Sequence, residues 1–271
     1  MVSQTETLSQ IREEITNMII LVMAVFTIGM FYSWLVLKNR TMRAIFGPIF
    51  TVLLIGAVWM TTSVFANNTG LTAKTTTTSK QVYSALGSKS PAGVLIQSRL
   101  GSKADNYVLV YNDTADAKNP TVHGKPSTKV ADIPTGVKKE MTYKVADVKK
   151  ATVKVETARW EWKNAFWRVM FGIGGQGGKL KKQVKTVTVP KNTWVVMTAD
   201  QSKKLQAAQK SAAPEVQAAQ QAQMKSVIEA KVAAYMQANP KATPDQVKAY
   251  TTEQTAEMTA TAMKQMLSQL K

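Results

Sequence analysis

Two long apolar stretches near the start of the chain constrain its fold more than any other feature. The first runs from Ile15 to Leu37 and the second from Ala44 to Ala66, and neither contains a charged residue. A helix of about 20 apolar residues crosses the hydrocarbon core of a bilayer, and core helices of soluble proteins rarely run so long without a charge. We therefore predict a transmembrane helical hairpin over residues 15–66, after an N-terminal extension at 1–14.

The charges that flank these stretches predict an orientation. The link Lys38–Arg43 contains three basic residues, whereas the extension before the first stretch contains one basic and three acidic residues. Because short basic loops stay in the cytoplasm, we expect the link to be cytoplasmic, with the N-terminus and everything after Ala66 outside. The sequence thus predicts a two-pass protein of the cell membrane, with the lipid bilayer as its first partner.

The second apolar stretch has another interpretation, as a signal peptide cleaved after Ala66. It follows basic residues and ends with the small residues Val64 and Ala66 at the spacing of a cleavage site. Its apolar core is long for a signal peptide, and another apolar stretch precedes it. We favour a second span, and cleavage stays the alternative.

Basic residues are concentrated in the middle of the chain. Of the net charge of +18, residues 67–199 carry +14, from 22 basic and 8 acidic side chains. A field of this sign outside a cell attracts anionic lipid headgroups or phosphate-rich wall polymers, and we do not expect nucleic acid there. The alternative is a well-solvated surface that needs no partner.

The region after the apolar stretches is expected to be rich in β-structure. Residues 67–80 are polar and Thr-rich, which is typical of an extended spacer. Between turn residues in 81–198 we predict strands in "KQVYSAL", "AGVLIQSRL", "NYVLVYN", "EMTYKVA", "ATVKVETARWEWK", "FWRVMF", "QVKTVTVP" and "NTWVVMT". Their spacing is too short for crossover helices, so we predict a small antiparallel, barrel-like sheet, with a long loop at 112–137. The fold class is then α+β.

A helical tail is predicted over residues 199–271, where Ala, Gln, Lys and Met dominate. Thr198 and Gln201 have the spacing of a capping box at its start. Pro214 and the "NPKATPD" segment divide it into three helices. Its apolar stripe is loose (Val247, Tyr250, Met258, Met263, Met266, Leu267 and Leu270), so the tail can pack on the sheet, pair with a partner helix or remain solvated.

A glycine-rich run, "GIGGQGGK" at 172–179, fits G-x-G-x-x-G but lacks the context of a nucleotide site. The residues after it have the composition of a strand instead of a helix, and Leu180 stands where a phosphate loop needs Ser or Thr. We therefore expect no cofactor, and favour a flexible hairpin loop in which several glycines take positive φ. The functional alternative is an anion-binding loop of backbone N–H groups and lysines. Its residues would be Gly174, Gly175, Gly177, Gly178, Lys179, Lys181 and Lys182.

Catalytic and metal-binding patterns are not found in the sequence. His123 is the sole histidine and lies in a Pro/Gly/Lys-rich segment, and Asp113 and Asp116 have the setting of turn formers. The aromatic residues between Trp160 and Phe171, interleaved with basic ones, are expected to be core, with base or sugar stacking as the alternative. We predict no catalytic residue, no metal site and no enzyme activity.

The segments "TARWEWKNAFWRVMFGIGG" and "VPKNTWVVMT" resemble domain of unknown function 4811, an uncharacterised family of two-helix membrane proteins of lactic-acid bacteria. The resemblance covers residues 16–210. It implies a location in the Gram-positive cell envelope and lends no activity or ligand. We therefore expect a membrane-anchored, non-enzymatic envelope protein whose basic domain binds anionic surface material or another integral membrane protein. The alternative is an accessory subunit of a transporter or export system.

Overall fold

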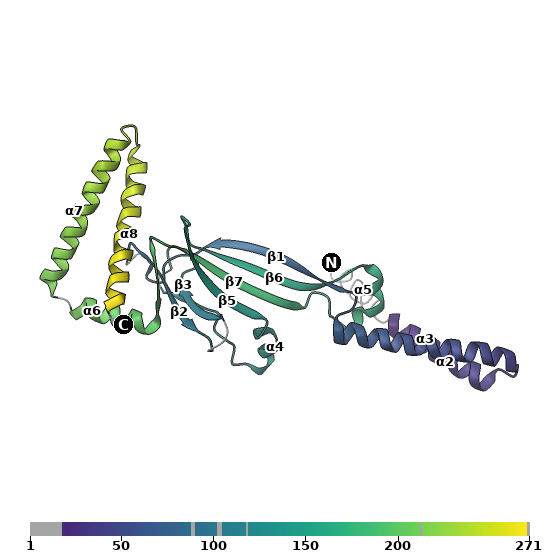
Figure 1. Cartoon of the computed structure of the whole chain (residues 1–271). Coiled ribbons are helices and arrows are strands. Elements are labelled where there is room, and N and C mark those ends of the chain that lie inside the picture. Colours follow the sequence, from purple (N-terminus) through teal and green to yellow (C-terminus); the bar gives the residue numbers. More distant parts are fainter. Residues whose placement is uncertain (1–17, 88–89, 102–104, 118, 212, 270–271) are drawn as a thin grey trace, which may run out of the picture. The chain divides into compact units, whose positions relative to one another are not determined.

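The computed structural model describes residues 18–87, 90–101, 105–117, 119–211 and 213–269 (Figure 1). Two compact units divide the chain. The N-terminal unit comprises Met1–Thr76 and Thr157–Lys182, and the sheet unit comprises Thr77–Glu156 and Gln183–Lys271. The predicted extension at 1–14 and the first residues of the first predicted span lie outside the described residues.

Two long helices form most of the described N-terminal unit. They are α2 (Met18–Phe31), continued by the π-helical turn η1 (Tyr32–Val36), and α3 (Arg40–Asn67). Asn39 caps α3, because its side chain accepts a hydrogen bond from the Thr41 N–H at 3.0 Å. This cap starts α3 earlier than we predicted, so part of the basic link is helical and Pro48 lies inside the helix.

The side chains of this helical pair are mostly exposed. In the most apolar window of each helix, only 11% and 6% of the residues are buried. Two glycines line the contact between the helices: a Cβ on Gly29 would meet the ring of Phe50, and one on Gly47 the ring of Trp34. Both helices are long and apolar enough to cross a membrane.

The predicted strand "FWRVMF" is wrong: these residues lie in helix α5 (Ala165–Phe171). Asn164 caps the helix by accepting a hydrogen bond from the Trp167 N–H at 3.2 Å. The rings of Trp167 and Phe171, one turn apart, lie with centroids 5.5 Å apart. A short aromatic run fits either a strand or a helix, and here the cap and the packing on α2 and α3 determine the outcome.

A long-stranded sheet has the order β1-β6-β7-β5. Its strands are β1 (Leu71–Gln81), β6 (Thr152–Trp162), β7 (Leu180–Pro190) and β5 (Lys139–Ala146). The Thr-rich segment at 67–80 is therefore not a spacer, because most of it forms the edge strand β1. Only Leu71 of β1 is buried, so the sequence of this strand shows no alternation of apolar and polar residues from which it could be predicted. The strand forms by backbone pairing with β6.

A short-stranded sheet has the order β4-β3-β2-β8. Its strands are β2 (Gly93–Arg99), β3 (Tyr107–Tyr111), β4 (Thr121–His123) and β8 (Trp194–Thr198). The prediction of one antiparallel sheet is wrong here, since β2 pairs with β8, and β5 with β7, in parallel. Strand spacing constrains only consecutive strands, and both parallel pairs join strands that are not consecutive. The two separate sheets do not confirm a barrel.

The predicted loop at 112–137 is only partly irregular. It contains β4, the 3₁₀ turn η3 (Val130–Asp132) and the short helix α4 (Ile133–Gly136). Side chains of both sheets form a shared core within the sheet unit. It consists of Val82, Leu95, Leu109, Tyr111, Met141, Ala151, Val153, Val187 and Val189.

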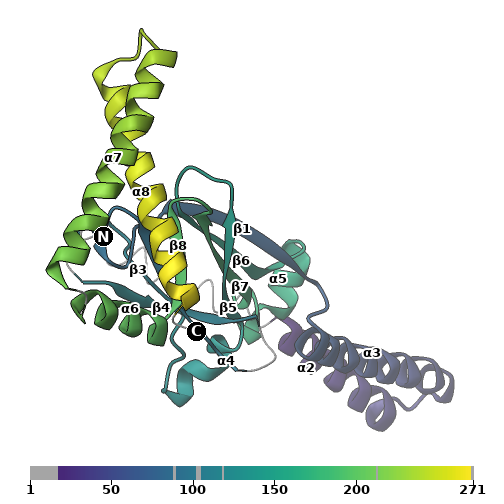
Figure 2. The ribbon, with the colours of Figure 1, turned by 60° about the vertical axis from the view of Figure 1, so that its left-hand side comes forward.

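Three helices follow β8, as predicted: α6 (Ala199–Ser211), α7 (Pro214–Ala238) and α8 (Pro244–Gln269). The capping box is confirmed, with Gln201 N–H donating to Thr198 Oγ1 at 3.1 Å and Thr198 N–H to Gln201 Oε1 at 2.9 Å. A second box, Thr243 with Gln246, starts α8. Figure 2 shows α7 and α8 as a hairpin that meets the short-stranded sheet at one end.

The tail packs on the sheet through α6 and the second half of α8. Their buried side chains Leu205, Ala260, Met263 and Leu267 share a core with Ala92, Val94, Val195 and Met197. No residue of α7, which the structure describes in full, is buried. The tail is therefore part core and part exposed hairpin. Leu270 of the predicted stripe lies outside the described residues.

Candidate functional site

The glycine-rich run connects α5 to β7 within the N-terminal unit. It begins with the 3₁₀ turn η4 (Gly172–Gly174), and Gly175 and Gly178 have positive φ angles of 55° and 81°. Glycine takes these angles without the steric cost of a Cβ, as the sequence predicted. The segment is not a plain hairpin loop, because α5 lies in the same connection between β6 and β7.

Close packing also explains the glycines. A Cβ on Gly174 would collide with the ring of Phe65 near the end of α3. A Cβ on Gly177 would lie 2.8 Å from the indole nitrogen of Trp162. The backbone of the run is thus pressed against aromatic side chains of α3 and β6, which argues for a fitted segment instead of a flexible loop.

Several backbone N–H groups of the run have internal acceptors. Gly175 N–H donates to the carbonyl of Gly172 at 3.0 Å, and Lys179 N–H to that of Gln176 at 3.3 Å. Gly178 N–H donates to the carbonyl of Trp160 at 2.6 Å. A backbone nest needs successive N–H groups that face a ligand, so these three groups do not form the nest that we considered.

The basic side chains beside the run are exposed and surround its backbone. Lys179 Nζ donates to the carbonyl of Gly174 at 3.1 Å, and Arg159 to that of Gly178 at 2.9 Å. The ammonium of Lys181 lies 4.4 Å from the ring centroid of Trp160, a cation–π contact. Lys182 is exposed beside them on β7.

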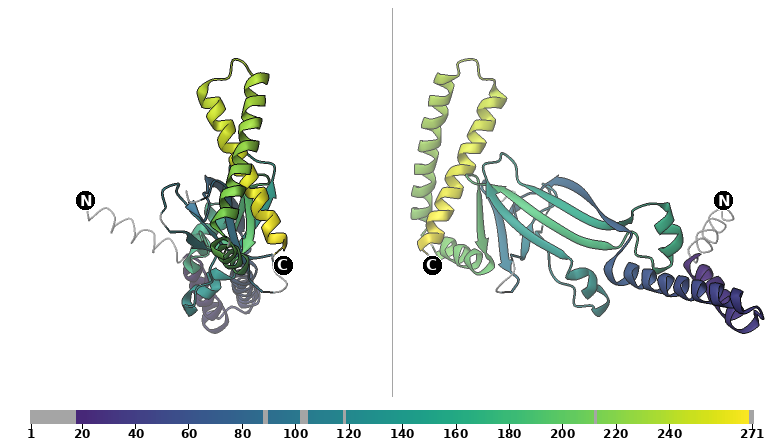
Figure 3. Two further views of the ribbon diagram at one scale, coloured as in Figure 1. Left: turned by 90° about the vertical axis from the view of Figure 1, so that its left-hand side faces the viewer. Right: turned by 45° about the vertical axis from the view of Figure 1, so that its right-hand side comes forward.

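Aromatic side chains of the same segment pack toward the two long helices. Phe171 is 1% exposed and shares a core with Ile19, Ala57 and Val64, with Trp162 and Trp167 partly buried against it. Phe166 is 58% exposed, so the prediction that these aromatics are core is wrong for it. Because Ile19 lies at the start of α2 and Val64 near the end of α3, this core forms at one end of the helical pair. Figure 3 shows the ribbon of α5 beside that end of the pair.

We call the exposed basic side chains of residues 157–182, the segment that contains Phe171, the collar: Arg159, Lys163, Arg168, Lys179, Lys181 and Lys182. Residues 157–182 contain a single acidic residue, Glu161. Its carboxylate lies 3.3 Å from the ammonium of Lys74 on β1. The collar therefore presents positive charge and partly exposed aromatic rings in the unit that contains the two apolar helices.

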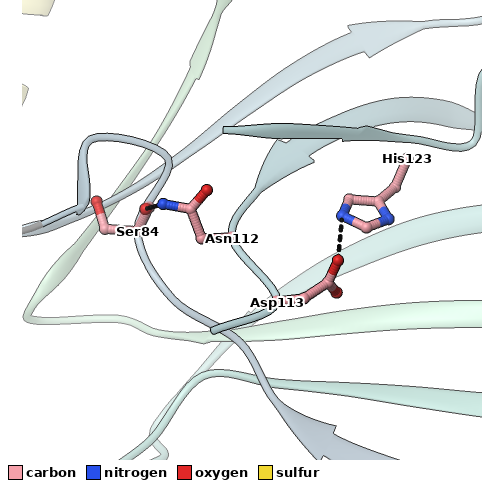
Figure 4. Close-up of polar contacts among 4 residues, drawn as sticks. All are labelled: Ser84, Asn112, Asp113 and His123. Carbon is pink, nitrogen blue, oxygen red and sulfur yellow. Dashed lines mark hydrogen bonds and ion pairs between the residues drawn. The ribbon is translucent and has the colours of Figure 1, made fainter. Parts of the chain in front are cut away.

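A second polar cluster lies in the sheet unit, around His123 on β4 (Figure 4). Its ring stacks on Tyr111 with centroids 3.9 Å apart, and Nε2 lies 3.4 Å from Asp113 Oδ2. Burial lowers the pKa of His123, against the opposing effect of Asp113. Burial also raises the pKa of Tyr111 to about 12. The sequence placed His123 and Asp113 in a loop and did not predict this contact.

The geometry of this cluster does not form a nucleophilic triad. Asn112 is 1% exposed and donates to the carbonyl of Ser84 at 2.8 Å. Figure 4 shows Ser84 on the far side of Asn112 from His123. The Ser84 hydroxyl accepts from the N–H groups of Leu86 and Val94, so it orders a turn. Among the described residues, no three His, Cys, Asp or Glu side chains are grouped to hold a metal.

Comparison with known proteins gives one match. The model of the family described as Domain of unknown function (DUF4811) matches residues 39–205. The match begins at the cap of α3 and ends within α6, so α2, α7 and α8 lie outside it, and it starts later than the resemblance we stated. No curated protein and no solved structure matches the chain. The family model covers more than half of the chain, and the chain therefore belongs to the DUF4811 family.

Proposed function

We propose that this protein is a two-pass, non-enzymatic protein of the cell membrane whose collar binds anionic lipid headgroups at the membrane surface. The observation that carries the proposal is the position of the collar at one end of an exposed apolar helical pair. Exposed apolar side chains along both helices require a nonpolar surrounding, which lipid supplies.

The orientation in this proposal follows from charges close to the spans. Lys38, Arg40 and Arg43 lie at the turn between the helices, and by the positive-inside rule they favour a cytoplasmic turn and a collar on the outside. The collar is also basic, but it is far along the sequence from either helix. Because the positive-inside rule acts on short flanking loops during insertion, residues 157–182 do not reverse the assignment.

Lipid headgroups suit the collar better than a single bound anion. Its cations are spread over β6, α5, β7 and the residues that connect them, and the N–H groups of Gly175, Gly178 and Lys179 already donate to internal carbonyls. Each basic side chain near an anionic surface contributes about 1 kcal/mol. A wall polymer carries the same phosphate chemistry and is the alternative source.

The test uses the full-length protein in bilayers that contain both phosphatidylglycerol and phosphatidylcholine. The protein is extracted with its surrounding lipid by a styrene–maleic acid polymer, and the lipid ratio is measured by mass spectrometry. We expect enrichment of phosphatidylglycerol that declines with salt, because exposed charges are screened over about 8 Å at physiological ionic strength.

Replacing Lys179, Lys181 and Lys182 together by Gln should reduce this enrichment. The matched control replaces Lys138, Lys139 and Lys144, which are also exposed but lie outside the collar. Equal losses from the two triple variants would show that total charge matters and the collar does not. Absence of enrichment at low salt would overturn the lipid proposal, and salt-sensitive binding of added polyglycerol phosphate would then favour the wall polymer.

A further inference from the structure

The helix α7 contributes no buried residue, although Met224, Ile228, Val232 and Tyr235, three or four positions apart, are half-buried. Its other large apolar side chains, Val216, Val227 and Met236, are exposed. Exposed apolar side chains on a helix that also bears Gln and charged residues are available to a partner. Within the hairpin, α7 has α8 as a neighbour, through the stacked rings of Tyr235 and Tyr250, 4.2 Å apart, and the contact between Thr259 and Met224.

A groove runs between α7 and α8 on one face of the hairpin. Its volume is about 920 Å³, and Met224, Val227, Met258 and Met266 line it together with six glutamines and Ala208 of α6. Met224, Met258 and Met266 are half-buried and Val227 is 40% exposed. Methionine side chains adapt to irregular surfaces, and they are common where helices dock. The groove is therefore a suitable surface for another helix.

The charge of the hairpin identifies what can occupy this groove. Residues 214–269 contain five lysines and five carboxylates, so the whole net charge of +18 lies elsewhere in the chain. Copies of this protein repel each other through their basic surfaces, whereas two hairpins do not. The groove itself contains one basic side chain, Lys231, and one acidic side chain, Glu257.

We propose that the hairpin is a homodimer interface, in which α7 and α8 of two copies form a four-helix bundle. A two-fold interface is self-complementary, so a contact from Lys231 to Glu257 of the second copy occurs twice. Lys231 Nζ donates across its own hairpin to Gln254 Oε1 at 2.8 Å. Glu257 is about one helical turn from Gln254, so Lys231 and Glu257 lie at nearly the same position along the helix axes. A two-fold axis parallel to the helices leaves positions along the helix axes unchanged, so it brings Lys231 of one copy next to Glu257 of the other.

The size of the hairpin is sufficient for a dimer. Helices of 25 and 26 residues are about 37 Å long, and a pair is about 20 Å wide. One face then covers roughly 700 Å² per copy, close to the value of about 800 Å² per partner for a stable interface.

Charge exchange in the full-length protein tests this proposal. The dissociation constant is measured by analytical ultracentrifugation in detergent micelles for the wild type, Lys231→Glu, Glu257→Lys and the double exchange. Each single exchange replaces two attractive contacts by two repulsive ones, so we expect dimerisation to weaken about tenfold, and the double exchange to restore it. The matched control is Lys225→Glu, which reverses an exposed charge on α7 outside the groove and should leave the dimer unchanged.

The chain contains no cysteine, which provides a second measurement. Mixed chains carrying Lys231→Cys and Glu257→Cys should form a cross-linked heterodimer on oxidation in preference to either homodimer. A wild type that remains monomeric overturns the proposal, even if it captures a different protein through this face. A dimer that Lys231→Glu and Lys225→Glu weaken equally, or that the double exchange fails to restore, also overturns it.

Discussion

The two helical pairs of this protein, α2 with α3 and α7 with α8, have similar lengths and differ in what their exposed side chains require. Both leave most of their surface uncovered. The first pair is free of charge along its apolar stretches, whereas the second combines Ala, Gln and Met with balanced charges. The exposed side chains of the two pairs therefore favour different surroundings: a nonpolar solvent suits the first pair, and water or another protein suits the second.

The pairs also differ in how they join a folded core. At one end of α2 and α3, Phe171 of α5 is buried between them. In the second pair, only α8 contributes buried side chains to a sheet, through Ala260, Met263 and Leu267. The comparison indicates that α8 is a necessary part of the sheet unit, while the far end of its hairpin is not.

Removal of the second pair is expected to have the largest effect. A chain that ends at Lys210 loses the part of the cover of the short-stranded sheet that α8 provides through Met263 and Leu267, and each buried Leu or Met contributes about 1.5–3 kcal/mol. The total of about 5 kcal/mol approaches the whole stability of a typical domain. We expect loss of cooperative thermal unfolding, measured by circular dichroism of the full protein in detergent.

The control for this truncation removes only residues 231–254, the far end of the hairpin, and rejoins the helices with a short turn. The buried residues of α8 remain, so cooperative unfolding should persist. Cooperative unfolding of the chain that ends at Lys210 would show that α8 is an appendage. The statement that α8 is a necessary part of the sheet unit would then be wrong.

A charge placed in each pair should separate the two environments directly. Val25 of α2 and Val216 of α7 are 52% and 51% exposed, so Val25→Lys and Val216→Lys are matched in chemistry and exposure. A lysine at the middle of a membrane helix costs about 2.5–3.5 kcal/mol, whereas an exposed substitution in water costs under about 0.5 kcal/mol. We expect only Val25→Lys to reduce membrane insertion, measured in a microsome assay. Equal tolerance would mean that α2 does not face lipid.

A change of pH should have the smallest effect and should act on the sheet that α6 and α8 cover. His123 is the sole histidine, and burial lowers its pKa below the ordinary value of about 6.5. The unfolded chain therefore binds a proton at higher pH than the folded chain, and stability decreases as the pH falls below about 6.5 toward the lowered value. Above that window His123 is neutral in both states and stability is unaffected.

The measurement compares melting temperatures of the wild type and His123→Gln between pH 7.5 and pH 5.5. The difference between the two proteins isolates His123 from other groups, including its neighbours Asp113 and Lys185. We expect the wild type to lose more stability over this range than His123→Gln does. Parallel curves for the two proteins would contradict the direction of the pKa shift.

Much of the architecture follows from local patterns in the sequence. Charge-free apolar length predicts the long helices, β-branched alternation predicts most strands, and the Thr198–Gln201 spacing predicts the start of α6. The predictions fail where local pattern is ambiguous or silent. The aromatic run at 166–171 becomes a helix through packing, and the polar strand β1 forms through pairing with β6.

The candidate site shows the same division. Its composition was visible in the sequence, as glycines beside Lys179, Lys181 and Lys182. Its geometry was not, because Phe65 and Trp162 approach the glycines from distant positions and internal carbonyls accept several N–H groups. The contact of His123 with Asp113 likewise depends on the pairing of β3 with β4.

The sequence by itself determined the local quantities: apolar length, charge distribution, caps and strand propensity, each set by neighbours within a few residues. The tertiary structure alone decided which strands pair in parallel, where the glycine run packs and which half of α8 is buried. These outcomes depend on contacts between residues tens of positions apart, whose free energy exists only once the chain has brought them together.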